Sequence, residues 1–141
     1  MKRILMICFS LLMILGSFSC NAQNNKKQNT AKTASSKVEV YYFHFTRRCM
    51  TCNAVETESK KSLQNLYPEQ VKKGAITFKS INLDDKSSES LANKCQASGQ
   101  SLLIIKGNKR TDLTSQGFMY ARNNPDKLKQ EIKKVVDPLL K

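Results

Sequence analysis

Cys49 and Cys52 are separated by two residues, a spacing that allows two thiols to close and reopen a disulfide. An apolar run, residues 38–45, and a short basic turn precede them, and a helical pattern begins at the first cysteine. A strand that leads into C-x-x-C at the start of a helix is the layout of a thiol–disulfide redox site. The same pair could instead bind a metal or metalloid, or form an inert structural disulfide. The residues themselves leave these two alternatives open.

The two cysteines are expected to have different roles. Thiol–disulfide exchange needs a thiolate that attacks and a second thiol that resolves the mixed disulfide. The helix N-terminus and the charges of Arg47 and Arg48 should favour a thiolate at Cys49, since such surroundings lower a cysteine pKa from about 8.5 to roughly 3.5–7.5. Cys52 lies one turn later on the buried face, so we expect it to keep a higher pKa and to resolve. Met50-Thr51, between them, brings neither proline nor charge, so no reduction potential is predicted.

His44 is the single histidine of the chain. Together with Cys49 and Cys52 it would complete a soft-metal site, and Cys95 would offer a further thiolate. We expect instead that His44 packs on its strand and that Cys95 is a small buried residue of a helix. The redox interpretation therefore assigns no metal, and the trio of His44 and the two cysteines is its metal-binding alternative.

The elements that hold the pair follow from the hydrophobic pattern. Residues 38–45 are apolar on both faces, as in a central strand covered on both sides, with Tyr42 and His44 on the same face. A helix is expected over about residues 49–66, ended by Pro68. The other expected elements are a strand over 75–83, a helix from Ser87 or Ser88 to Gln96, a strand over 101–105, a hairpin turn at 106–109, a polar strand near 111–114, a turn at Gln116-Gly117, and a helix from Asn124 to Pro138. This order predicts an α/β domain with a central mixed sheet and flanking helices.

The first 37 residues have a different character. Residues 1–19 carry a basic start, a short apolar stretch and small residues, as a secretory signal of the lipoprotein type does. Cys20 stands where such a signal places its lipidated cysteine. Residues 20–37 are polar and predict a disordered tether, because they cannot bury enough apolar surface to offset the entropy of ordering. We therefore expect an exported, periplasm-facing domain, 38–141, anchored to a membrane through the Cys20 lipid.

The formal net charge of +13 does not indicate a nucleic-acid partner. Part of the excess lies in the N-terminal segments, and the remaining lysines are scattered along every expected element instead of forming a patch interleaved with aromatic residues. A solvated basic surface, with some attraction to anionic lipid, is expected instead. No flavin or nicotinamide fingerprint is present in the sequence, so no cofactor is predicted.

The order of elements, with C-x-x-C opening the first helix, resembles the thioredoxin superfamily over residues 38–141. More narrowly, YYFHFTRRCMTCNAVE (41–56) resembles bacterial thioredoxin-like proteins named "nitrophenyl compound nitroreductase subunit, ArsF family". Many members are small lipoproteins, and their genes tend to lie beside a membrane protein related to the cytochrome-biogenesis thiol transporters. The resemblance implies a thiol or disulfide protein partner and electrons delivered across the membrane by such a transporter.

Two departures from the thioredoxin pattern bear on function. The chain has no Trp, and Gln100 and Ser101 stand where thioredoxins carry a cis-proline that faces the cysteines. In the family that proline keeps metal off the cysteines and holds a partner's backbone, so its absence favours metal binding over a generic reductase. The sequence thus predicts an exported, membrane-tethered thiol–disulfide oxidoreductase or electron-relay subunit. The alternative is a thiolate module that binds copper, zinc or arsenic for a membrane transporter.

Overall fold

Strand β1 (Val38–His44) lies inside a sheet of four strands in the order β2-β1-β3-β4. The computed structural model describes residues 37–141, so the predicted signal (1–19), the lipidation site Cys20 and nearly all of the tether (20–37) lie outside the described residues. Strand β2 (Ile76–Asn82) runs parallel to β1, and β3 (Ser101–Lys106) runs antiparallel to it on the other side. Strand β4 (Lys109–Asp112) forms the far edge as the antiparallel partner of β3. The predicted mixed sheet is confirmed.

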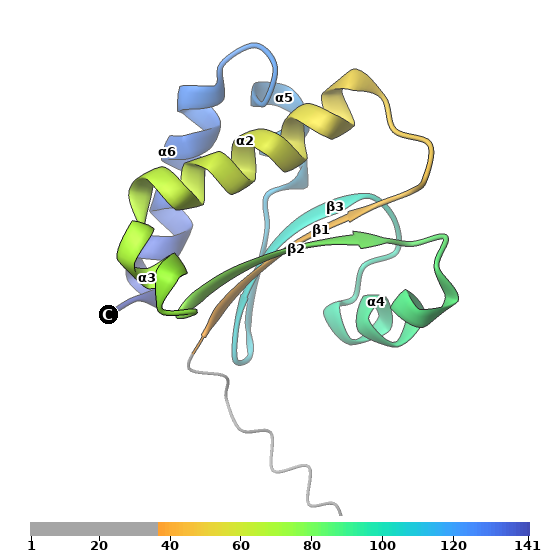
Figure 1. Ribbon diagram of the computed structural model, residues 1–141, viewed down its shortest axis with the longest axis horizontal. Helices are drawn as coiled ribbons and strands as arrows, with labels where there is room; N and C mark the ends of the chain where they lie inside the picture. Colours follow the sequence, from red (N-terminus) through yellow and green to blue (C-terminus); the bar gives the residue numbers. More distant parts are fainter. Residues whose placement is uncertain (1–36) are drawn as a thin grey trace, which may run out of the picture. The chain divides into compact units, whose positions relative to one another are not determined.

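Helices cover both faces of this sheet (Figure 1). The parallel connection from β1 to β2 runs through α2 (Met50–Leu66) and the short α3 (Pro68–Lys72). Helix α2 shares its face with α5 (Thr114–Tyr120) and α6 (Pro125–Val136), whereas α4 (Glu89–Cys95) packs on the opposite face. The single-turn helices η1 (Lys86–Ser88) and η2 (Asp137–Leu139) precede α4 and follow α6. None of the helices within residues 37–141 is both long and apolar enough to cross a membrane.

The side chains of β1 divide between two hydrophobic clusters, as the alternation of a doubly covered strand requires. Val40 and Tyr42 belong to the cluster under α2 and α6, together with Val55 of α2. Tyr41 and Phe43 belong to the cluster under α4. Adjacent residues of β1 are therefore separated by the sheet, and only one face of the strand points toward the helix that carries the two cysteines.

The predicted turn at Gln116-Gly117 is wrong, because both residues lie inside α5. Strand β4 also ends at Asp112, two residues before the predicted end of the polar strand. Gly117 is buried, and a Cβ built on it would lie 3.1 Å from Cγ1 of Val55 and 3.4 Å from Cδ2 of Leu102. The glycine thus allows α5 to approach α2 and β3 closely, which a local sequence pattern does not distinguish from a turn. Pro68 likewise occupies the first turn of α3 and does not simply end α2.

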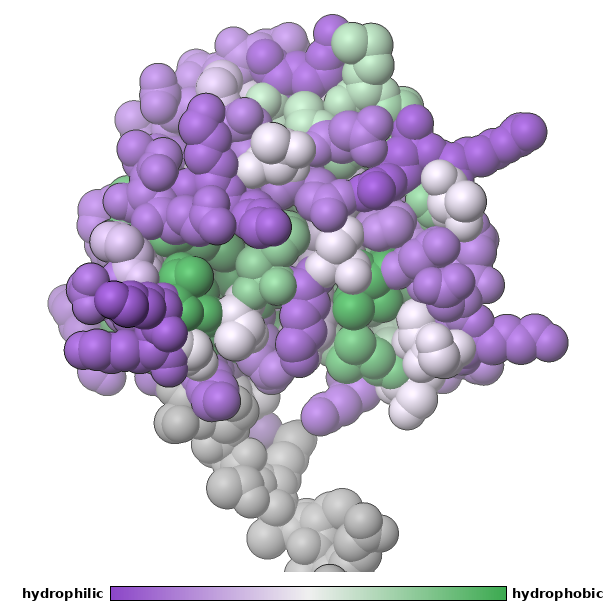
Figure 2. Space-filling view, in the orientation of Figure 1, coloured by the Kyte–Doolittle hydropathy of each residue, from purple (hydrophilic) through white to green (hydrophobic). Residues whose placement is uncertain are grey.

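Hydrophilic side chains cover most of the face shown in Figure 2, and apolar ones form small separate areas. Several lysines pair with acidic neighbours a few residues away, among them Lys127 with Glu131 within α6 and Lys133 of α6 with Asp137 of η2. The excess positive charge is therefore part of a solvated surface.

Candidate functional site

Cys49 is the N-cap of helix α2, with an extended backbone (φ −78°, ψ 169°) and an exposed side chain. The backbone N–H of Cys52 donates a hydrogen bond to the sulfur of Cys49 over 3.2 Å. The backbone N–H of Asn53 donates to the carbonyl oxygen of Cys49 over 3.1 Å, which is the first hydrogen bond of the helix. The first cysteine thus occupies a place that Ser, Thr, Asp or Asn usually takes, and its sulfur accepts one of the N–H groups that a helix N-terminus leaves without a partner.

These contacts lower the pKa of Cys49 below its ordinary value. A hydrogen bond from the Cys52 side chain contributes most, and the backbone N–H groups of Cys52 and Thr51 add to it. The charges of Arg47 and Arg48, which the sequence suggested as a cause, are not among these contributions. Arg48 instead forms an ion pair with Glu56 of α2. Arg47 is exposed on the turn before the cysteine.

Cys52 is nearly fully buried, with 4% of its surface exposed. Burial raises its pKa, and the hydrogen bond between the two cysteine side chains acts in the same direction. The pair is therefore asymmetric: the outer sulfur ionises first, and the inner one keeps its proton. This is the order that attack followed by resolution requires.

Gln100 reaches the pair from the loop before β3. Its side-chain oxygen lies 3.6 Å from the Cys52 sulfur, so it accepts the thiol hydrogen bond whenever the single proton of Cys52 is not donated to Cys49; the two residues are far apart in the sequence. Ser101 begins β3 opposite Phe43 and is buried, and its hydroxyl donates to the carbonyl of Gly99. Of the two residues suggested at the position of the family's cis-proline, Gln100 is the one that contacts a cysteine.

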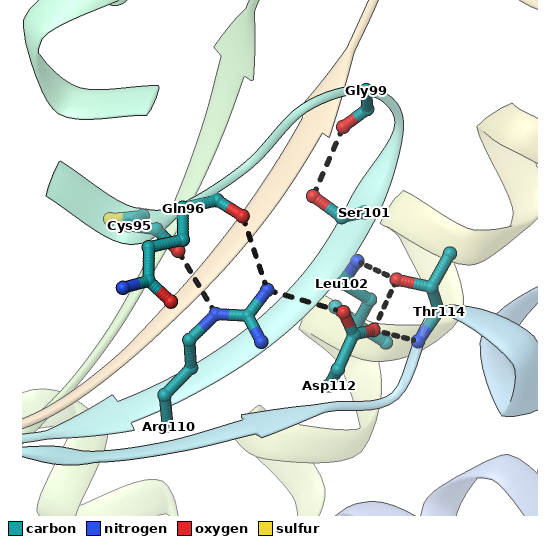
Figure 3. A network of polar contacts seen from close by, with 8 residues as sticks. All are labelled: Cys95, Gln96, Gly99, Ser101, Leu102, Arg110, Asp112 and Thr114. Atoms are coloured by element: carbon teal, nitrogen blue, oxygen red, sulfur yellow. Dashed lines mark hydrogen bonds and ion pairs between the residues drawn. The ribbon is translucent and has the colours of Figure 1, made fainter. Parts of the chain in front are cut away.

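A polar network holds both ends of this loop (Figure 3). At its start, the Arg110 side chain donates to the carbonyl oxygens of Cys95 (2.9 Å) and Gln96 (3.4 Å), at the C-terminus of α4. At its end, Thr114 accepts from the backbone N–H of Leu102 over 3.0 Å. Asp112 joins the two halves, because it pairs with Arg110 and accepts from both the N–H and the hydroxyl of Thr114.

The sequence pattern did not predict this network. The pattern Asp112-Leu113-Thr114 could have indicated a helix start at this point, since Asp and Thr favour such positions. It would not have predicted the long-range bonds of Arg110 to the end of α4. The network fixes the two anchor points between which Gln100 is presented to Cys52.

The side chains of the metal-binding alternative are not gathered at one point. His44 is buried, with its ring Nδ1 3.0 Å from the carbonyl oxygen of Phe45 and its ring 5.8 Å from that of Tyr42. Cys95 lies in the cluster under α4, across the sheet from α2, and burial raises its pKa. Within residues 37–141, no group of three or more His, Cys, Asp or Glu side chains is arranged to hold a metal ion.

Comparison with known proteins gives matches among solved structures only: no family model and no curated protein matches the chain. The chain is similar to thioredoxin-2 of the malaria parasite, a component of its protein secretion machinery, with 26% identity over 70% of this chain and 82% of that one and a TM-score of 0.44. It is also similar to a malarial protein (23% identity, 60% and 92% covered, TM-score 0.40). A third similar structure is thioredoxin from Trypanosoma brucei brucei (16% identity, 74% and 79% covered, TM-score 0.45).

The sheet order β2-β1-β3-β4, with one parallel and two antiparallel pairings, carries C-x-x-C at the start of the helix that follows β1. The fold is thioredoxin-like. The predicted fold class is confirmed, with the cysteine pair at the start of the helix that follows the central strand.

The asymmetry of the site predicts an order of reaction with an alkylating reagent. In the reduced full chain, Cys49 should be modified much faster than Cys52 or Cys95 near neutral pH. The thiolate is the reactive form, and of the three cysteines within residues 37–141 only Cys49 combines exposure with a lowered pKa. Its rate should fall only when the pH drops through that lowered pKa. Mass analysis of peptides after pulses at several pH values measures each rate separately. Equal rates at Cys49 and Cys52 would contradict the asymmetry.

Proposed function

We propose that this protein is a thiol–disulfide oxidoreductase in which Cys49 attacks and Cys52 resolves. The observation that carries the proposal is the contrast between the two sulfurs. One is exposed, accepts an N–H at a helix start and has a lowered pKa, and the other is buried and has a raised pKa. An inert structural disulfide needs no such contrast.

The reaction starts when the thiolate of Cys49 attacks a disulfide of the partner. A mixed disulfide forms between Cys49 and one partner sulfur, and the other partner sulfur leaves as a thiolate that takes a proton from water. Cys52 then loses its proton to water and attacks the sulfur of Cys49. The Cys49–Cys52 disulfide forms, the second partner thiol is released, and two electrons have passed to the partner. The reverse sequence oxidises a partner dithiol.

A protein partner suits the surroundings of Cys49. Met50, directly beside it, is 73% exposed, and Phe45 at the end of β1 is 40% exposed. Large apolar side chains that remain exposed beside a reactive thiol favour contact with a polypeptide over a small polar thiol. The exposed Arg47 adds a positive charge at the same turn.

The place of this reaction is a further part of the proposal. Residues 1–19 would direct export and Cys20 would carry a lipid, so that the domain faces the periplasm on a tether. The resemblance of residues 41–56 to the ArsF family supports a membrane thiol transporter as the source of electrons, with this chain as the relay subunit.

In the native bacterium, Cys20→Ser should move the protein from the membrane to the soluble fraction, with Cys8→Ser as the matched control. Equal membrane retention of Cys20→Ser and wild type would contradict the anchor.

Because Cys49 attacks and Cys52 resolves, replacing one or the other should stop the reaction at different steps. Cys49→Ser should abolish reduction of a test protein disulfide, because no attacking thiolate remains. Cys52→Ser should accumulate a mixed disulfide between Cys49 and the substrate, because no thiol resolves it. Non-reducing electrophoresis and peptide mass analysis of the full chain distinguish the two results.

Cys95→Ser is the matched control for these variants. Its sulfur lies across the sheet from the pair, so the variant should retain both the activity and the resolving step. Mixed disulfides that form through Cys95, or activity that survives in Cys49→Ser, would contradict the assigned roles.

A further inference from the structure

The thiol of Cys52 has one proton and two acceptors within reach. The sulfur of Cys49 is one of them, since a hydrogen bond from the Cys52 side chain is the largest contribution to the lowered pKa of Cys49. The side-chain oxygen of Gln100 is the other, 3.6 Å from the Cys52 sulfur. A thiol donates one hydrogen bond at a time, so the two acceptors compete for it.

The outcome of this competition depends on the chemical state of Cys49. As a thiolate, Cys49 carries a full charge, and a charge-assisted hydrogen bond is roughly twice as strong as a neutral one. In a mixed disulfide the same sulfur is neutral and bonded to the partner, and such a sulfur is a weak acceptor. The amide oxygen of Gln100 is then the better of the two acceptors.

Bonds that do not involve the cysteine pair hold Gln100 in place. The loop that carries it, residues 96–100, is bonded at its start to the side chain of Arg110 (Figure 3). At its end, the backbone of β3 is bonded to the hydroxyl of Thr114. The amide oxygen is therefore available to Cys52 whichever bond the outer sulfur makes.

We propose that Gln100 is the positioning residue for the resolving thiol. When Cys49 forms a mixed disulfide, the Cys52 thiol shifts its hydrogen bond from Cys49 to the Gln100 oxygen, and this bond delays the resolving step. The amide thereby lengthens the time for which a partner stays bound to Cys49. The inference rests on the proposed dithiol reaction for its place in the cycle.

Gln100 neither gains nor loses a proton in this step. Cys52 gives its proton to water, its thiolate attacks the sulfur of Cys49, and the Cys49–Cys52 disulfide forms. The bond between Cys49 and the partner sulfur breaks, and the partner thiolate takes a proton from water. Because the thiol must give up its bond to Gln100 before it ionises, the amide favours the protonated form of Cys52.

The ionisable groups around Cys52 come from three elements. Cys49, at the start of the same helix, raises the pKa of Cys52 through its charge and its side-chain hydrogen bond. On β1, the charge of Cys52 acts on Tyr42, which keeps its proton because burial raises its pKa. Arg48, in the turn before α2, and Glu56, within α2, form an ion pair with each other. The loop before β3 contributes a neutral amide.

The hydrogen bond can be observed directly in the infrared, because a bond to an amide oxygen lowers the S–H stretching frequency of a thiol. The full chain carrying Cys49→Ser represents the mixed disulfide, since serine is neutral at this position and still caps α2. The spectrum of this parent is compared with that of the parent carrying Gln100→Leu. Loss of one band on adding Cys52→Ser to the parent assigns that band to Cys52.

Gln100→Leu should move the Cys52 band to higher frequency, toward that of a thiol without a strong acceptor. The band of Cys95 should stay in place. Cys95 ends α4 at the other end of the same loop, so its unchanged band reports that the loop keeps its position.

Two replacements of similar size should shift the pKa of Cys52 in opposite directions in the same parent. Gln100→Leu removes the acceptor and should lower that pKa by about half a unit, which speeds alkylation of Cys52 about threefold below it. Gln100→Glu places a negative charge there and should raise the pKa by about one unit, which slows alkylation about tenfold. Gln96→Glu makes the same charge change at an exposed residue of this loop and should follow the parent curve. Peptide mass analysis after pulses at several pH values reports Cys52 separately.

A Cys52 band that does not move in Gln100→Leu would overturn the inference. A raised pKa of Cys52 in Gln100→Leu would also overturn it, because the amide nitrogen would then donate to the thiolate instead of the oxygen accepting from the thiol. Neither result bears on the proposed function, which fails separately if Cys52→Ser traps no mixed disulfide.

Discussion

The hydrogen bond from the Cys52 N–H to the sulfur of Cys49 is the contact on which the account depends. It exists because α2 begins at Met50, so that Cys49 is the cap and Cys52 lies one turn inside. The start of α2 is fixed in turn by β1, whose two covered faces hold it inside the sheet. A shift of the helix start by one residue would move one sulfur away from the N–H groups and the other away from its buried place.

The sheet then separates groups that the sequence places side by side. Tyr41 and Tyr42 are neighbours, yet the hydroxyl of Tyr41 bonds to Glu39 on the α4 side, and Tyr42 packs in the cluster on the α2 side, where residues 37–141 offer its hydroxyl no hydrogen-bond partner. Cys95 is separated from the C-x-x-C pair in the same way. Alternation along a strand thus decides which titratable groups share a face of the sheet, and the loop before β3 adds an acceptor, Gln100, for the thiol of Cys52.

The sequence predicted the mixed sheet, the helix after β1 and the place of the two cysteines, because strand alternation, helical periodicity and C-x-x-C spacing are all local signals. It suggested Gln100 or Ser101 at the site from the family resemblance, and only the contact of Gln100 with Cys52 separates the two. It missed α5, because Gly117 has its reason in Val55 and Leu102, far away in the sequence. The pairing of Arg48 with Glu56 also depends on the folded arrangement of the turn and the helix, which no local pattern contains.

The proposed function requires that Cys49 and Cys52 form a reversible redox couple. The most direct test is a titration of the full chain in thiol–disulfide buffers, with acid quench, alkylation and mass analysis of the peptide that carries both cysteines. We expect a reversible two-electron transition, whose midpoint separates a reductant at about −270 mV from an oxidant at about −120 mV. A pair that stays oxidised across the whole range would be a structural disulfide, and a pair that never closes would be no redox site. Either result would contradict the account.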